Sequence, residues 1–332
     1  MRLVVCGGAG FIGSTFVGLR VREHGDDVTV LDKLTYAGRL ENLRDVADEI
    51  RFVEGAIEDP AAVAEAVAGA DAIVNFAAET HVDRSIAEPF AFSVTNGLGT
   101  HVLLEAARER DLRYVQVSTD EVYGSIESGS FTESSPLAPS SPYSATKTGA
   151  DLVVCSYFHT YGLPTLVCRG SNNYGPRQYP EKLIPLMVLN ALAGDHLPVY
   201  GDGRNVRNWL FVEDFGRGIG HVLAHGKPGE VYNCGGPDEC ENIEVVKRIL
   251  ALTGSDQSLI EYVTDRPGHD RRYSLSAAKL EALGWRARTR FEEGLALTVD
   301  WYRDNSWWWD PIRSGAYREY YERHYGRALK EG

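Results

Sequence analysis

Short apolar runs and amphipathic stretches alternate along the first half of the chain. Helical patterns occupy residues 11–23, 89–110 and 143–161, and an alanine-rich helix is predicted between residues 54 and 71. The predicted strands are residues 3–6, 28–31, 51–54, 71–75 and 114–118. Alternation of strand and helix is typical of βαβ units, so we expect an α/β fold built on a doubly wound parallel sheet.

A glycine-rich turn follows the first predicted strand. Gly7, Gly10 and Gly13 stand three apart and lead into a helical pattern. This spacing allows a tight turn, close approach to a pyrophosphate and a helix N-terminus that faces it. The second strand ends in Asp32, 19 residues past Gly13. A carboxylate there can bind both hydroxyls of an adenosine ribose, so the unit is predicted to be of the Rossmann type.

The same carboxylate discriminates between cofactors. Asp32 would repel a 2′-phosphate, which favours NAD over NADP. Lys33 and Arg39 are two nearby cations that argue the other way.

A tyrosine and a lysine mark a candidate hydride-transfer site. Tyr143 and Lys147 stand four apart in a helical pattern, so both side chains would share one face. A phenolate near neutral pH requires about 4 kcal/mol of stabilisation, because an unperturbed tyrosine ionises near pKa ~10. Lys147 and a cationic nicotinamide could supply it. Ser118 and Thr119 directly follow a predicted strand, the pattern of such a site.

Two adjacent carboxyls add a further capacity. Asp120 and Glu121 come next in the chain. Removing water from a sugar requires a base for a carbon-bound proton and an acid for the leaving hydroxyl, and two carboxyls with different pKa values could divide these tasks. After the fourth strand, small residues suit the passage of a flat cofactor, and Thr80 and His81 could face the substrate, although a loop histidine is more often structural.

The second half of the chain is predicted to be a smaller, mixed α/β substrate lobe. Residues 172–176 have turn chemistry, and residues 180–192 open a helix. The aromatic tail, residues 301–325, contains a predicted helical segment at 315–324 whose rings are expected to pack. We expect a Rossmann domain at residues 1–175 and a substrate domain at 176–332, with late segments interleaved.

Composition limits the possible partners. The chain has 332 residues, of which 43% are hydrophobic and 24% charged, and its net charge of −13 argues against nucleic acid as a partner. No apolar run has the length of a membrane span, and the chain starts directly in a strand without a secretion-type segment. Five cysteines show no metal-type spacing, so we expect no metal site and reduced thiols in a cytoplasmic protein.

These motifs together resemble the extended short-chain dehydrogenase/reductases and, among them, the dTDP-glucose 4,6-dehydratases. The resemblance rests on residues 7–13 with Asp32, residues 32–38, 76–85, 118–124 and 143–147, and it continues through residues 169–176, 180–183, 198–207 and 265–273. Asp120 and Glu121 are its most specific element, because epimerase relatives generally lack them. It implies that Tyr143, Lys147, Thr119, Asp120 and Glu121 are catalytic.

The resemblance also implies binding residues. For NAD these are Gly7, Gly10, Phe11, Ile12, Gly13, Asp32, Lys33, Thr35, Ala37, Gly38, Ile57, Ala77, Ala78, Tyr143 and Lys147. For the nucleotide sugar they are Thr80, His81, Asn172, Glu181, Lys182, Leu183, Pro198, Tyr200, Arg207, Asn242, Arg266, His269 and Tyr325. The implied activity is dehydration of dTDP-glucose: oxidation at carbon 4, loss of water across carbons 5 and 6, and return of hydride to carbon 6.

Some alternatives stay open at this stage. A sugar-nucleotide 4-epimerase would use the same Tyr143 and Lys147, a UDP-sugar could replace the dTDP-sugar, and an NAD-sensing scaffold would need no intact base. Ala56 stands where the family carries an Asp that accepts the adenine amino group, a loss worth about 1 kcal/mol of NAD binding. We expect a homodimer, paired through the exposed faces of the two long helices.

Overall fold

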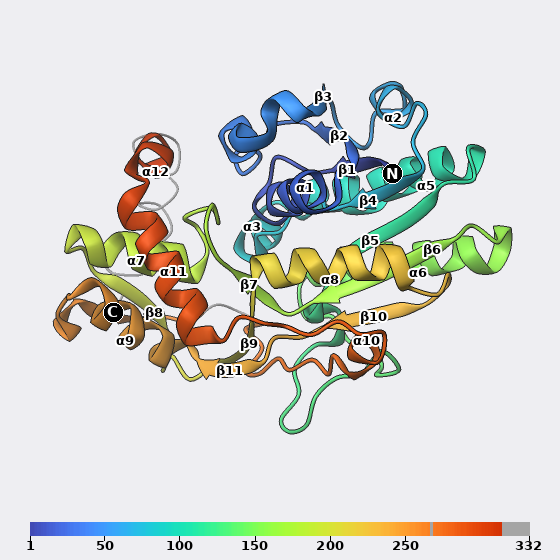
Figure 1. Cartoon of the computed structure of the whole chain (residues 1–332). Coiled ribbons are helices and arrows are strands. Elements are labelled where there is room, and N and C mark those ends of the chain that lie inside the picture. Colours follow the sequence, from blue (N-terminus) through green and yellow to red (C-terminus); the bar gives the residue numbers. More distant parts are fainter. Residues whose placement is uncertain (266–267, 314–332) are drawn as a thin grey trace.

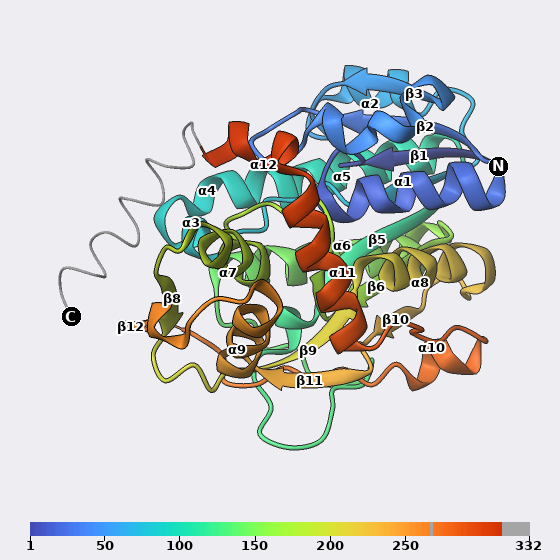
Figure 2. The same cartoon turned by 60° about the vertical axis from the view of Figure 1, so that its left-hand side comes forward.

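The computed structural model describes residues 1–265 and 268–313 (Figures 1 and 2). Its largest element is a seven-stranded sheet of order β10-β6-β5-β4-β1-β2-β3 in which all neighbours are parallel. The strands are β1 (Arg2–Cys6), β2 (Asp27–Asp32), β3 (Ile50–Glu54), β4 (Ala72–Asn75), β5 (Arg113–Thr119), β6 (Thr165–Gly170) and β10 (Val231–Cys234). The five strands predicted from the apolar runs are all present, and the Rossmann-type parallel sheet is confirmed.

Helices cover both faces of this sheet because alternate strand residues point to opposite sides. Leu3 and Val5 of β1 pack toward α1 (Phe11–His24), the 3₁₀ segment η1 (Leu40–Glu49) and α8 (Val212–His225). Val4 and Cys6 pack on the other side, toward α2 (Pro60–Ala66), α5 (Thr100–Glu109) and α6 (Pro142–Tyr161). Burial on both faces explains why β1 and β4 read as apolar runs rather than alternating with polar residues.

The order of the strands reverses between β1 and β4. Chains leave these two neighbours toward opposite faces of the sheet, which opens a crevice outside their carboxyl ends. The glycine-rich turn follows β1 and the segment 76–81 follows β4, so both predicted cofactor segments meet there.

The smaller lobe contains two short sheets and a separate apolar core. One sheet has the order β11-β9-β7, with one antiparallel and one parallel pair, and the other pairs β12 with β8. Its elements are β7 (Asn172–Tyr174), α7 (Leu183–Ala193), β8 (Leu197–Tyr200), β9 (Val206–Phe211), β11 (Asp238–Glu241), α9 (Asn242–Thr253), β12 (Ile260–Val263), α11 (Phe291–Asp304) and α12 (Ser306–Arg313). The core gathers aromatic side chains such as Trp209, Phe291 and Tyr302, and a mixed α/β lobe is therefore present as expected.

The chain crosses between the two lobes more than once. α8 and β10 lie after residue 175, yet they belong to the large sheet and its cover. A division at 175/176 with interleaved late segments is retained as a proposal.

Two predicted helices differ in detail. The stretch 89–110 is divided into α4 (Pro89–Phe92), a π-helical segment η2 (Ser93–Gly99) and α5. The wide turn contains Asn96. Its side-chain oxygen accepts a hydrogen bond from the backbone nitrogen of Glu79, and its side-chain nitrogen donates to the carbonyl oxygen of Glu79 and to the hydroxyl of Thr146. The helix expected from residue 180 begins at Leu183, because Lys182 has an extended backbone. The helical segment predicted at 315–324 lies outside the described residues.

Short elements complete the described chain, namely α3 (Val82–Ala87), η3 (Asp120–Tyr123), η4 (Gln257–Leu259) and α10 (Ala278–Ala282). Within residues 1–265 and 268–313, no helix has both the length and the apolar character needed to cross a membrane. Over the same residues, His, Cys, Asp and Glu form no group that could hold a metal ion.

Candidate active site

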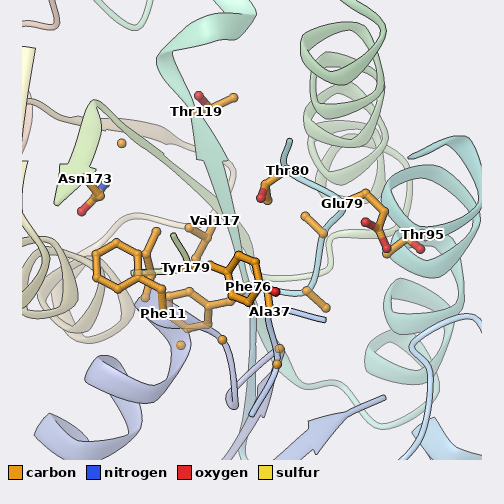
Figure 3. A pocket seen from close by; sticks show the side chains of 18 of the residues that line it. Phe11, Ala37, Phe76, Glu79, Thr80, Thr95, Val117, Thr119, Asn173 and Tyr179 are labelled. Carbon is orange, nitrogen blue, oxygen red and sulfur yellow. The ribbon is translucent and has the colours of Figure 1, made fainter. Parts of the chain in front are cut away.

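A large cavity opens at the carboxyl ends of β1, β2, β4 and β5 and reaches the smaller lobe (Figure 3). Figure 3 shows Thr119 at the top of the view and the rings of Phe76 and Phe11 below it, while Asn173 approaches from β7 of the smaller lobe. All predicted NAD residues line it: Gly7, Gly10, Phe11, Ile12, Gly13, Asp32, Lys33, Thr35, Ala37, Gly38, Ile57, Ala77, Ala78, Tyr143 and Lys147. All five predicted catalytic residues line it as well.

The glycine-rich turn leaves no room for side chains. Gly7 has φ +73°, and a Cβ there would lie 2.5 Å from the backbone nitrogen of Ala77. A Cβ on Gly13 would lie 2.2 Å from the carbonyl oxygen of Gly7. The turn is therefore held against the loop after β4 and against its own helix, with the N-terminus of α1 open to the cavity. This cradle fits the pyrophosphate of a dinucleotide.

Asp32 is positioned where a ribose would lie. Its carboxylate accepts from the backbone nitrogens of Ala9 and Leu34, both at 2.9 Å, which fixes its orientation. A Cβ on Gly38 would lie 2.6 Å from this carboxylate, so the glycine keeps the approach clear.

The two cations that argued for NADP are both engaged elsewhere. Lys33 donates to Glu58 at 3.2 Å and to the hydroxyl of Thr95 at 3.1 Å. Arg39 donates to the carbonyl oxygen of Trp308 at 2.7 Å and lies 3.2 Å from Glu41. Neither arrangement leaves a cation dedicated to a 2′-phosphate, so the residues fit NAD.

Tyr143 and Lys147 share one face of α6, as their spacing predicted. Ser141 and Ser144 form a capping box that starts this helix immediately before Tyr143. The phenol hydrogen-bonds to Thr119 at the end of β5, and the Lys147 ammonium donates to the carbonyl oxygen of Val117 at 2.7 Å. A helix start and a strand end therefore bring the Tyr143 phenol and the Lys147 ammonium to the same region of the cavity.

Burial opposes charge on both groups. It lowers the pKa of Lys147 to about 8, against the attraction of Asp151. Burial and the charge of Glu121 raise the pKa of Tyr143 above its ordinary value, although the bond to Thr119 opposes this. The phenol is therefore neutral near neutral pH, and a cation close by would be needed to favour its ionised form.

Asp120 and Glu121 differ in environment, as a division of acid and base roles requires. Asp120 is 2% exposed, and burial together with the charge of Glu121 raises its pKa to about 8. Its Oδ1 accepts from the hydroxyl of Thr119 at 3.2 Å, while its Oδ2 is buried without a hydrogen-bond partner among the described residues. Near neutral pH Asp120 is therefore largely protonated, with one oxygen available to a ligand.

The predicted substrate residues fall into two groups. Thr80, Asn172, Glu181 and Lys182 line the cavity (Figure 3 labels Thr80). The second group does not line it: His81, Leu183, Pro198, Tyr200, Arg207, Asn242 and His269. Arg266 and Tyr325 lie outside the described residues.

Some of the second group have visible local roles. The Nδ1 of His81 accepts from the backbone nitrogen of Arg84 at 3.4 Å and caps α3, the structural role that loop histidines usually have. Arg207 lies close enough to Asp120 for its charge to lower the pKa of Asp120. The guanidinium carbon of Arg207 lies over the ring of Tyr273, 4.4 Å from the ring centre. The rings of Tyr200 and His269 meet edge to face at 6.1 Å.

Comparison with known proteins places these features in a family. The family model described as GDP-mannose 4,6 dehydratase matches residues 4–298. The chain belongs to this dehydratase family. A dTDP-glucose 4,6-dehydratase of Streptomyces niveus is 52% identical over 323 residues, which cover 95% of this chain and 96% of the relative.

Solved structures agree with this family assignment. DesIV, a dTDP-glucose 4,6-dehydratase of Streptomyces venezuelae solved with NAD and TYD bound, is 53% identical with a TM-score of 0.92 and covers 94% of this chain and 100% of its own. A UDP-glucose 4-epimerase of Thermus thermophilus in complex with NAD is 32% identical with a TM-score of 0.86, covering 92% and 100%.

The site of this dehydratase family member includes residues that the sequence motifs did not indicate. Asn173 and Gln178 line the cavity beside Ser118, which the strand-end pattern had already indicated. Each of the three has a buried side-chain oxygen without a hydrogen-bond partner among the described residues. Tyr179 also lines it (Figure 3). The only sequence signal for Asn173, Gln178 and Tyr179 is the run of polar residues around the Gly175-Pro176 turn. This signal is weak, because turn residues are usually polar for local reasons.

Proposed function

We propose that this chain is an NAD-dependent hydro-lyase that converts dTDP-glucose to dTDP-4-keto-6-deoxyglucose. The observation that carries the proposal is the buried Asp120, protonated near neutral pH beside Glu121, in the cavity that also holds Tyr143, Lys147 and the dinucleotide cradle. Oxidation of an alcohol alone does not require the two carboxyls. Elimination of water requires both.

The cofactor would lie between the glycine-rich turn and Lys147. Gly7, Gly10 and Gly13 would receive its pyrophosphate and Asp32 its adenosine ribose. Bound NAD supplies a hydride acceptor for carbon 4, a hydride donor for carbon 6, and the positive charge of its oxidised nicotinamide ring.

Tyr143 acts on the 4-hydroxyl of the glucose. The phenol must ionise to remove this proton, and burial and the charge of Glu121 resist that ionisation. Lys147 lies one helical turn away and lowers the free energy of the phenolate through its charge. Thr119, which bonds the phenol, would orient the reacting hydroxyl.

The carboxyl pair performs the elimination. A 4-keto group acidifies the proton on carbon 5, which Glu121 removes. Asp120 gives its proton to the departing 6-hydroxyl, so water leaves and Asp120 becomes the carboxylate. This elimination leaves a 4-keto sugar with a double bond between carbons 5 and 6. Carbon 6 would then receive the hydride that the reduced cofactor supplies, and carbon 5 would receive the proton held by Glu121, which gives the 4-keto-6-deoxy sugar.

The nucleotide sugar would extend from these groups into the smaller lobe. The cavity is lined on that side by Thr80, Asn172, Glu181 and Lys182. An anionic diphosphate needs a local cation in a protein with a net charge of −13, and the sugar hydroxyls need hydrogen-bonding groups. We propose that His81, Leu183, Pro198, Tyr200, Arg207, Asn242, Arg266, His269 and Tyr325 complete the binding of the diphosphate, ribose and base. The guanidinium of Arg207 can bind a diphosphate bidentately.

A 4-epimerase is the second candidate, favoured by the structural likeness to the Thermus thermophilus UDP-glucose 4-epimerase. Incubation of the purified protein with dTDP-glucose separates the two. The dehydratase forms a 4-keto-6-deoxy sugar, which is detected by its ultraviolet absorbance in alkali. The epimerase forms only the other hexose epimer. A parallel reaction with UDP-glucose tests base preference, and dTDP-glucose that remains unchanged contradicts the proposal.

We also propose a homodimer. Leu98 of η2 and Leu152 of α6 are 54% and 57% exposed on two packed helices that cover one face of the sheet. A second copy would bury this face. Leu152→Glu is expected to produce monomers in sedimentation or scattering measurements, and an unchanged mass would contradict this interface.

The five cysteines are all free thiols. This state is suited to a reducing compartment, and we propose a cytoplasmic location.

A further inference from the structure

A hydrogen-bonded relay connects the smaller lobe to the dinucleotide turn. Trp308 of α12 is 1% exposed and belongs to the apolar core of the smaller lobe. Its indole nitrogen donates to the Oδ1 of Asn42 at 2.7 Å. The amide nitrogen of Asn42 donates in turn to the carbonyl oxygen of Ala9 at 2.8 Å. Ala9 lies inside the glycine-rich turn, and its own nitrogen donates to Asp32.

Arg39 joins the same two ends by a second route. Its backbone nitrogen donates to the carbonyl oxygen of Ala9 at 3.0 Å, and its guanidinium donates to the carbonyl oxygen of Trp308 at 2.7 Å. The guanidinium also lies 5.3 Å from the centre of the Trp308 ring. The Ala9 carbonyl therefore accepts two hydrogen bonds, and both donors also contact Trp308. Figure 2 shows α12 in red beside the blue segment that follows β2.

The relay ends where the cofactor would begin. Ala9 stands directly before Gly10, which lines the cavity and donates from its backbone nitrogen to the Gly7 carbonyl. Ala9 is fully buried and Asn42 is 3% exposed, so water cannot easily replace a lost partner. A change in the position of the Ala9 carbonyl would displace the adjacent backbone groups that face the pyrophosphate.

We propose that Asn42 and Trp308 are positioning residues for the dinucleotide turn, through which α12 of the smaller lobe controls the release of NAD. Neither residue lines the cavity, so each acts through Ala9 rather than by touching a ligand. A turn held in its binding shape before NAD arrives binds it more tightly, because less ordering is required on binding. The inference rests on the proposed function in one respect, namely that NAD is the cofactor.

The test compares two substitutions in one helix. Trp308→Phe keeps an aromatic ring and removes the bond to Asn42. Trp309→Phe is the matched control, because the indole nitrogen of Trp309 donates to the carbonyl oxygen of Tyr302 at 2.8 Å and, among the described residues, forms no hydrogen bond with the glycine-rich turn or Asn42. NAD release from each purified holoprotein is followed after mixing with an excess of a competing dinucleotide, and the thermal midpoint of each protein is recorded.

We expect Trp308→Phe to release NAD about five-fold faster than the wild type, the equivalent of one lost hydrogen bond. Trp309→Phe is expected to release NAD at the wild-type rate even if its thermal midpoint falls equally. Equal release rates for the two variants would overturn the inference. A wild-type protein that binds no NAD would instead contradict the proposed function itself.

A second variant covers the case in which Trp308→Phe does not fold. Asn42→Ala removes the middle of the relay and is also expected to accelerate release about five-fold. Where both single variants fold, the double variant should release NAD no faster than the faster single variant, because both substitutions break one path. If the acceleration of NAD release in the double variant equals the product of the two single accelerations, the two residues contribute independently and the relay is refuted.

Discussion

Asp120→Asn is expected to make the protein more stable while it removes the proposed acid. The folded state holds the pKa of Asp120 at about 8, whereas an unfolded aspartate ionises near pKa ~3.9. Between these two values the folded state binds the extra proton, so ionisation favours the unfolded state and stability declines as pH rises. Asparagine has nearly the same shape, cannot ionise, and keeps an oxygen for the hydroxyl of Thr119.

The size of the effect follows from the interval between the two pKa values. From about 3.9 to pH 7 is about three pH units, which corresponds to about 4 kcal/mol of unfolding free energy. This figure is an upper value for Asp120→Asn, because the new amide group must also be buried. The difference in unfolding free energy between variant and wild type should increase by about 1.4 kcal/mol per pH unit between about pH 5.5 and about pH 7.5. It should then level off above the folded pKa of about 8.

Urea titrations at several pH values measure this difference. Asp202→Asn is the control, because Arg271 lowers the pKa of the exposed Asp202 to about 2. A lowered pKa affects stability only as pH falls toward it, so the Asp202→Asn difference should stay constant over the same range. A constant difference for Asp120→Asn as well would refute the raised pKa. Loss of dehydration by about 10²- to 10⁴-fold is expected in the same variant, and full activity would remove Asp120 from the mechanism.

Three further predictions concern the ends of the cavity. Glu121→Gln should abolish elimination but retain oxidation at carbon 4. Reduced nicotinamide should therefore accumulate, which is measured by its ultraviolet absorbance. Unchanged dehydration would exclude Glu121 as the base. Ala56→Asp should restore an acceptor for the adenine amino group and tighten NAD binding about five-fold in equilibrium dialysis, whereas unchanged affinity would show that the acceptor is unimportant. Tyr36→Phe removes the hydroxyl that donates to Glu181 at 2.8 Å. In steady-state kinetics, the KM for dTDP-glucose should increase about ten-fold with little change in kcat. An unchanged KM would show that this bond does not orient Glu181.

Much of the cofactor site could be predicted from the sequence because its signals are local. The glycine spacing, the position of Asp32 at a strand end and the four-residue step from Tyr143 to Lys147 depend only on strand and helix geometry. The apolar runs predicted every strand from β1 to β5, although the edge strand β3 is only partly buried.

The tertiary structure decided which groups these local signals would meet. Arg39 could have served a 2′-phosphate, but it bonds Trp308, which lies 269 positions later in the chain. His81 follows β4 in the sequence, and only the folded chain shows that its Nδ1 caps α3. The pKa of Asp120 depends first on its burial and on the charge of Glu121, and then on Arg207, which is remote in sequence. The periodicity of a sequence identifies only residues that are neighbours within one helix or one strand. Burial and long-range pairing arise when distant segments pack together, and they determine the charge of the proposed catalytic groups.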